Sequence, residues 1–107
     1  MPLQLPVQTK KELIERILAS RQRICSYGVK QLGIFGSFVR DHAKESSDVD
    51  FFVDFYPERK NFDAFMDLGF YLEELTGRKI EIVTPQSLNK FIGKYITQEV
   101  EYVSIVA

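Results

Sequence analysis

Two aspartates placed two residues apart, Asp48 and Asp50, carry the most informative chemistry in this sequence of 107 residues. Residues 48–55 alternate in character, which predicts a β-strand, so both carboxylates project from one face and Asp54 continues that face. At an effective dielectric constant of about 20, two unit charges about 4 Å apart repel by about 4 kcal/mol. Such a pair indicates a bound cation, a raised pKa, or simply a strand face in water. Among cations, Mg²⁺ takes oxygen ligands and completes its octahedron with substrate phosphates.

A Gly-Ser pair upstream of the aspartates offers a second part of the same chemistry. Gly36-Ser37 follows an apolar segment that predicts a strand over 29–35, and it precedes a short helix or turn predicted over 38–44. Glycine lets the backbone approach a phosphate closely, and free amides at a helix start together with a serine hydroxyl bind phosphate oxygens. Taken alone, the pair describes an ordinary turn. Its combination with the two aspartates is what points to a phosphate ligand.

Helices and strands alternate along the rest of the chain and must position these groups. A capping pattern at Thr9 and Glu12 begins a helix that Gly28 ends, and Asn61 begins another that Gly77 ends. The predicted helices cover residues 10–26, 61–76 and a segment from Pro85 onward. The predicted strands cover residues 29–35, 48–55 and 79–84, and residues 98–107 fit either a helix or an edge strand.

This order predicts an α/β (α+β) fold, in which helices pack on a small mixed β-sheet. The connection from Gly36 to Asp48 is too short for a crossover helix, so the first two strands should be antiparallel. A full helix joins the second and third strands, which should therefore be parallel. The length predicts one domain over residues 1–107.

Composition excludes several classes of protein. The chain is 45% hydrophobic and 27% charged, which is typical of a soluble globular protein. One cysteine and one histidine allow neither a disulfide framework nor a zinc module. No apolar run approaches the roughly 20 residues of a membrane span, and no signal-peptide core is present. We therefore expect a cytoplasmic protein with no membrane partner.

Charge is unevenly distributed along the chain. Residues 1–40 hold seven basic and two acidic residues, whereas residues 41–74 hold three basic and ten acidic residues. Direct nucleic-acid binding is not expected, because no overall basic excess exists and no aromatics interleave the basic residues of the first predicted helix. The acidic middle third is either a cation site or a solvated surface.

The combined pattern of Gly36-Ser37, ten residues, and Asp48-Val49-Asp50 resembles the nucleotidyltransferase superfamily of DNA polymerase beta-like fold. The string Gly-Ser-Phe-Val-Arg … Glu-Ser-Ser-Asp-Val-Asp-Phe-Phe-Val looks most like the minimal nucleotidyltransferases, small domains often encoded beside a HEPN-domain protein. The resemblance covers nearly the whole chain, because a helix precedes the first strand and Lys79-Ile-Glu-Ile-Val-Thr-Pro resembles the third strand of the family.

The resemblance implies a catalytic and metal site. Gly36 and Ser37 would hold the β- and γ-phosphates of the nucleotide. Asp48 and Asp50 would ligate two Mg²⁺ ions, with Mn²⁺ as an alternative. Glu81 would be the third carboxylate, which joins the metal site and helps to activate the attacking hydroxyl.

Two positions leave alternatives open. The family usually has Asp where this chain has Glu81. An added methylene moves the carboxylate by more than about 1 Å, whereas catalysis tolerates roughly 0.5 Å. Glu81 is therefore a working base or ligand, a source of slow turnover, or a plain polar strand residue. Arg40 matches a nucleotide-binding position of the family, and it pairs either with phosphates or with a nearby carboxylate. Asp41 replaces a frequent glycine and predicts a different local turn.

The resemblance implies an enzyme that transfers AMP from ATP, with Mg²⁺, to a hydroxyl of a partner protein. In-line attack on the α-phosphate would release pyrophosphate. The expected acceptor is a tyrosine of a HEPN-family toxin, so AMPylation would make this chain the antitoxin. One alternative is a weakly active or inactive module that neutralises the toxin by occlusion. Another is a dimeric nucleotidyltransferase that acts on a small molecule.

The predicted helix over 61–76 has more apolar surface than one sheet needs. Phe62, Met66 and Phe70 form a second stripe beside the one that should pack on the sheet. This stripe packs internally, against the C-terminal segment, against a second copy in a homo-oligomer, or against another protein. Elsewhere, His42 is expected at the surface, and Cys25 is expected to be a buried thiol without chemistry.

Overall fold

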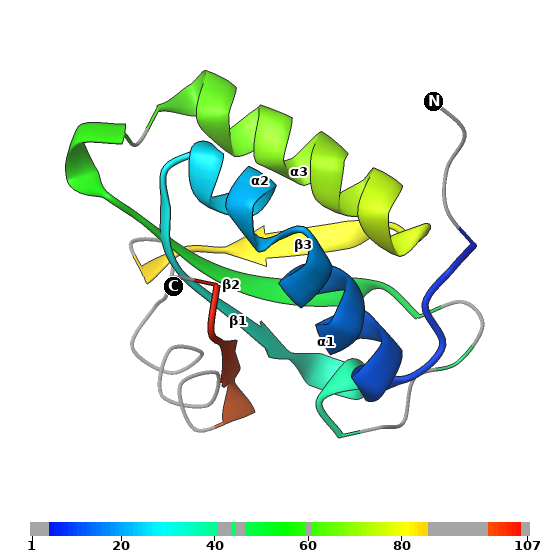
Figure 1. Cartoon of the computed structure of the whole chain (residues 1–107). Helices are drawn as coiled ribbons and strands as arrows, with labels where there is room; N and C mark the ends of the chain where they lie inside the picture. Colours follow the sequence, from blue (N-terminus) through cyan, green and yellow to red (C-terminus); the bar gives the residue numbers. More distant parts are fainter. Residues whose placement is uncertain (1–4, 41–43, 45–46, 60, 86–98, 106–107) are drawn as a thin grey trace.

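The sheet has four strands in the order β3-β2-β1-β4 (Figure 1). The computed structural model describes residues 5–40, 44, 47–59, 61–85 and 99–105. Strand β2 pairs antiparallel with β1 and parallel with β3, and β1 pairs antiparallel with β4. The predicted mixed sheet and α/β class are therefore confirmed. The strands are β1 (Val29–Phe35), β2 (Val49–Phe55), β3 (Ile80–Val83) and β4 (Glu101–Val103).

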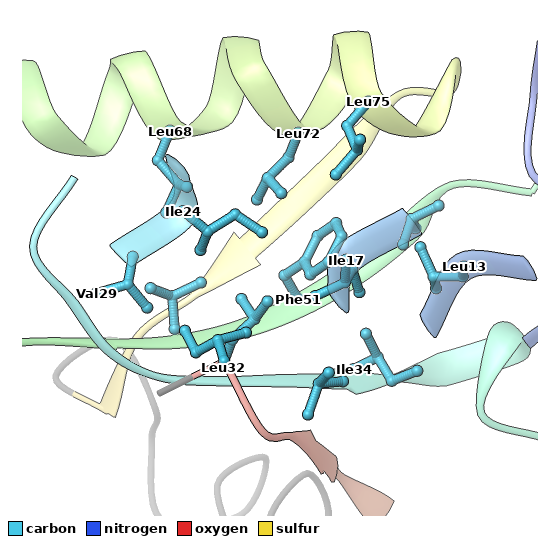
Figure 2. Packing of buried hydrophobic residues seen from close by; sticks show 14 of the residues in the cluster. Leu13, Ile17, Ile24, Val29, Leu32, Ile34, Phe51, Leu68, Leu72 and Leu75 are labelled. Carbon is cyan, nitrogen blue, oxygen red and sulfur yellow. The ribbon is translucent and has the colours of Figure 1, made fainter. Parts of the chain in front are cut away.

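Within the described residues, three helices lie on one face of this sheet, namely α1 (Lys10–Ala19), α2 (Arg21–Ser26) and α3 (Phe62–Thr76) (Figure 1). Between helices and sheet lies the apolar core, to which α3 contributes leucines and the two shorter helices contribute leucine and isoleucine (Figure 2). The labelled core side chains are Leu13, Ile17, Ile24, Val29, Leu32, Ile34, Phe51, Leu68, Leu72 and Leu75. All of them are almost completely buried, so the sheet is held firmly from one side.

The helix ends follow the predicted capping residues. The Asn61 side chain accepts a hydrogen bond from the Ala64 backbone N–H at 2.8 Å, and Gly77 ends α3 in the left-handed conformation with φ 69°. At the first helix, Thr9 Oγ1 accepts from the Glu12 N–H at 3.1 Å. These three caps confirm where the helices begin and where α3 ends.

The prediction of one continuous helix over 10–26 is wrong. Ser20 leaves the helical conformation (φ −112°, ψ 15°), and its N–H donates to the Ile17 carbonyl while its own carbonyl starts α2 by accepting from Ile24. Serine competes with helical hydrogen bonding and tolerates such a break. The break directs Ile24 into the core and leaves Leu18, from the predicted apolar face, exposed.

For residues 98–107 the sequence fits either a helix or an edge strand. The structure shows an edge strand, β4, over residues 101–103. The helix predicted from Pro85 onward falls almost wholly on residues 86–98, outside the described residues. Within the described ranges, no helix is both long and apolar enough to cross a membrane.

Candidate active site

Strand register brings the predicted site residues to one end of the sheet. Asp50, on the central strand β2, lies opposite Phe35 at the end of β1 and opposite Glu81 on β3. Asp48 is exposed and lies one residue before β2 begins. Because Gly36 follows Phe35 directly, the Gly-Ser pair and the acidic residues meet at this end. Asp54, by contrast, pairs with Gln31 four residues further along β2, or about 13 Å away.

Gly36 makes a close approach that no other residue could make. Its φ is 79°, and a Cβ built there would collide with the Asp50 carboxylate, 3.2 Å from Asp50 Cγ. The short 3₁₀ turn η1 (Gly36–Phe38) begins at this glycine, whose carbonyl accepts from the Val39 N–H at 3.1 Å. Sequence reasoning assigned the glycine to phosphate access. The structure adds a second reason, which is contact between the turn and Asp50.

Asp50 is held where ionisation is unfavourable. Partial burial, followed by repulsion from Glu81, Asp48 and Glu99 and by a hydrogen bond with Glu81, raises the pKa of Asp50 to about 6. The side chain is half-buried, while Asp48 and Glu81 are exposed. Each of these causes disfavours the ionised carboxyl of Asp50, so a cation bound there would favour the ionised form.

The ability of the acidic residues around Asp50 to bind a metal depends on their donor atoms and on how close together they lie. In the part of the chain that the structure describes, no three carboxylate, histidine or cysteine side chains are grouped closely enough to hold an ion. The acidic residues around Asp50 offer only oxygen donors, which is the ligand type that Mg²⁺ prefers. Mg²⁺ commonly binds through one or two carboxylates together with substrate phosphates. The donor set therefore fits Mg²⁺ that arrives with a nucleotide.

Arg40 and Glu99 form an ion pair beside the Gly-Ser turn. Of the two uses foreseen for Arg40, the structure shows the one with a nearby carboxylate. Glu99 was not among the predicted site residues, although its charge acts on Asp50. No local sequence pattern points to Glu99, because it reaches the site only through the pairing of β4 with β1.

Arg78 is a second residue that sequence reasoning missed. Its guanidinium donates to the backbone carbonyls of Lys44 and Ser47, each at 2.9 Å, and so holds the chain that leads into Asp48. The same group lies 5.2 Å from the centre of the Phe38 ring in η1. Arg78 therefore links the Gly-Ser turn to the segment before the aspartates.

Three further residues were singled out in the sequence, namely Cys25, Asp41 and His42. Cys25 is half-buried and its thiol donates to the Ile105 carbonyl at 3.3 Å, which is a packing role. Asp41 and His42 fall outside the described residues.

Comparison with known families identifies the class of protein. The family model described as "Nucleotidyltransferase domain" matches residues 11–104. The chain belongs to the nucleotidyltransferase family. The resemblance drawn from Gly36-Ser37 and Asp48-Val49-Asp50 is thus confirmed, as is the expectation of a nucleotidyltransferase enzyme.

Relatives and solved structures agree with this assignment. Protein adenylyltransferase MntA of Thermococcus cleftensis is 44% identical over 94 residues, which cover 88% of this chain and 84% of that protein. A solved structure described as a minimal nucleotidyltransferase is 28% identical with a TM-score of 0.68, covering 82% of this chain and 93% of that one. A complex of tri-AMPylated Shewanella oneidensis HEPN toxin with MNT antitoxin shares the fold at 13% identity and a TM-score of 0.61, covering 88% of this chain and 71% of that one.

Proposed function

We propose that this nucleotidyltransferase transfers AMP from ATP, with Mg²⁺, to a tyrosine hydroxyl of a HEPN-family toxin and thereby acts as its antitoxin. The observation that carries the proposal is the position of Asp50, half-buried between the Gly36 turn and Glu81. The relative named as protein adenylyltransferase MntA supports the choice of AMP and of a protein acceptor. The solved complex of an AMPylated HEPN toxin with its antitoxin supports the choice of partner.

In this proposal, different residues bind the phosphates, bind the metal and accept the proton. Gly36, Ser37 and Arg40 bind the β- and γ-phosphates, while Asp48 and Asp50 are the metal ligands, joined by Glu81. When bound, Mg²⁺ supplies positive charge against the phosphate oxygens and the leaving pyrophosphate.

The chemical step is one in-line displacement at phosphorus. The tyrosine oxygen forms a bond to the α-phosphorus, and the bond from that phosphorus to the bridging oxygen of the β-phosphate breaks. Glu81, which is exposed on β3, accepts the proton of the attacking hydroxyl. The electron pair of the broken bond leaves with pyrophosphate.

A label-transfer experiment tests this function. The purified chain and a purified HEPN-domain partner are incubated with Mg²⁺ and ATP labelled at the α-phosphate, in parallel with ATP labelled at the γ-phosphate. We expect α-label, and no γ-label, on the partner. Asp50→Asn should reduce transfer at least about a hundredfold. Asp54→Asn is the matched control, because Asp54 is a half-buried aspartate on the same strand but away from Gly36.

Two results would contradict the proposal in different ways. Equal transfer by wild type and Asp50→Asn would place the chemistry elsewhere. Complete lack of transfer, with the partner still bound and silenced, would favour neutralisation by occlusion, the alternative that the Glu81 substitution keeps open.

The toxin needs a docking surface, and α3 offers an apolar one. The Phe62 and Phe70 side chains are 75% and 61% exposed, and Met66 between them is half-buried. Beside them, between α3 and β3, lies a hollow of about 210 Å³. Its lining is Phe65, Met66, Gly69, Phe70, Glu73, Ile80 and Ile82. Aromatic and methionine side chains are enriched at protein interfaces, which favours a protein partner here.

Charge on α3 favours a partner other than a second copy. The helix sequence contains four acidic residues and no lysine or arginine. In a symmetric dimer through α3, the acidic residues of one copy would lie close to those of the other and repel them. We therefore infer that α3 docks an apolar toxin surface rimmed by basic residues, rather than making the homo-oligomer that the sequence left open.

A further inference from the structure

The ion pair between Arg40 and Glu99 lies where a nucleotide should bind. Arg40 follows η1, and its backbone N–H donates to the Gly36 carbonyl at 3.3 Å, so it belongs to the Gly-Ser turn. The Glu99 side chain is only 14% exposed, whereas the Arg40 side chain is 46% exposed. A nearly buried carboxylate thus holds an arginine that solvent and a ligand can still reach.

Strand pairing explains why Glu99 lies at this position. On β4, Val103 pairs with Leu32 and Glu101 pairs with Ile34, so the chain just before β4 lies at the Gly36 end of β1. The influence of Glu99 on the Asp50 carboxyl agrees with this placement. Glu99 therefore pairs with the guanidinium of Arg40, and its charge also acts on the carboxyl of Asp50.

We propose that Glu99 is an internal anion that occupies Arg40 in the nucleotide-free protein and that the triphosphate of the incoming nucleotide displaces it. This inference rests on the proposed role of Arg40 in phosphate binding. The planar guanidinium fork pairs with a carboxylate and with a phosphate in the same geometry, so the two anions compete for one partner. Glu99 is a positioning residue, because it acts through Arg40.

The exchange also links nucleotide binding to metal binding. Once a triphosphate takes Arg40, the Glu99 charge loses its partner while it remains near Asp50. A divalent cation in the acidic cluster then gains a further favourable interaction. Displacement of Glu99 should therefore make ATP and Mg²⁺ bind more cooperatively than they would to a chain that lacks this charge.

Binding calorimetry on the full chain tests the proposal without any measurement of activity. Wild type and Glu99→Gln are titrated with ATP and with AMP, without and with Mg²⁺. We expect Glu99→Gln to lower the Kd for ATP about fivefold without Mg²⁺, which is the size of one partly exposed ion pair. The Kd for AMP, which lacks the β- and γ-phosphates, should not change. Added Mg²⁺ should tighten ATP binding less in Glu99→Gln than in wild type.

Glu101→Gln provides the matched control. Glu101 lies two residues further along the same segment and pairs with Lys10 at 2.7 Å. Its neutralisation removes one negative charge and one ion pair while leaving Arg40 and Glu99 intact. We expect the Kd for ATP to stay within about twofold of wild type, and thermal melting should show that both variants remain folded.

A double-mutant cycle with Arg40→Gln separates competition from general repulsion. If Glu99 acts through Arg40, Glu99→Gln should not tighten ATP binding in the Arg40→Gln background. A gain that persists there would overturn the proposal, because removal of any negative charge would then suffice. An unchanged Kd in Glu99→Gln alone would overturn it as well, and weaker binding of ATP with Mg²⁺ would show that Glu99 is a metal ligand instead.

The same titrations distinguish this inference from the proposed function. If wild type binds ATP and Glu99→Gln changes nothing, the proposed role of Glu99 is wrong, but the proposed enzyme function is unaffected. Lack of ATP binding by wild type and by every variant would remove both.

Discussion

At the scale of single residues, Asp50 shows how the fold stores unfavourable electrostatic energy at a site. Its carboxyl is half-buried, and its pKa is raised to about 6 from 3.8, with burial as the main cause and Glu81 next. The folded chain therefore holds this proton more tightly than the unfolded chain does. Ionisation of Asp50 opposes folding as the pH rises from about 4 through 6, and the penalty is complete above that range.

Asp50→Asn should consequently stabilise the protein without divalent ions at about pH 8. The difference between a pKa of 3.8 and one of about 6 corresponds to about 3 kcal/mol, and screening of a half-exposed side chain reduces this to about 1–2 kcal/mol. The gain should vanish near pH 4, where the wild-type carboxyl is protonated in the folded chain. Urea unfolding at both pH values measures the difference.

The control for this measurement is Asp54→Asn, an aspartate on the same strand that lies away from the acidic cluster. It should change the free energy of unfolding by less than about 0.5 kcal/mol. If the gain from Asp50→Asn persisted unchanged at pH 4, relief of charge repulsion would not be its cause.

At the scale of elements, local signals and connection lengths predicted most of the fold, whereas two features that depend on long-range packing were missed. Caps at Asn61 and Gly77 define α3, and β1 runs over residues 29–35 as expected, because turn and cap residues act on their own neighbours. The break at Ser20 depends on how two helices pack on the sheet. The strand β4 exists only through its pairing with β1, which no local pattern in the tail specifies.

The site, too, has residues that were predicted from the sequence and residues that were not. The grouping of Gly36 with Asp50 and Glu81 follows from a local motif and from strand order, and it was predicted. The contributions of Glu99 and Arg78 come from segments that are distant in sequence, so they were not. Roles for the grouped residues remain predictions that the experiments above address.

The junction between β1 and η1 offers a prediction at this scale. Gly36→Ala should lower the free energy of unfolding by about 3 kcal/mol, because a left-handed backbone costs about 1–2 kcal/mol and the new methyl group collides with Asp50. Gly77→Ala tests the same left-handed backbone at the end of α3 and should cost about 1 kcal/mol. Urea unfolding compares the two, and equal losses would show that contact with Asp50 is unimportant.

At the scale of the whole molecule, the proposed catalytic site and the proposed docking surface lie in different places. The acidic cluster lies at one end of the sheet, whereas Phe62 and Phe70 lie along the exposed side of α3. A toxin that docks on α3 must therefore bring its acceptor around to the sheet end. Separate surfaces allow binding and transfer to be lost independently.

Replacement of Phe62 and Phe70 by serine should weaken binding of the HEPN-domain partner at least about tenfold, because exposed aromatic anchors dominate such interfaces. Melting temperature should change little, since neither side chain is in the core. Surface binding measurements with the purified partner test this, and Leu18→Ser on α1 serves as an exposed apolar control. If the double variant had a lower molecular mass in solution than wild type, without any partner present, α3 would instead join two copies of this chain.

The position of β2 between two partners has a consequence for motion. The Asp50 backbone lies inside the sheet, between β1 and β3, so it opens to solvent only when the sheet itself comes apart. Glu99 precedes a strand of three residues at the sheet edge, which can separate from β1 at far lower cost. Amide hydrogen exchange should accordingly be slow around Asp50 and fast around Glu101. The backbone around Asp50 should therefore stay closed for as long as the protein is folded. The segment that holds Glu99 beside Arg40 should open and close many times in the same period.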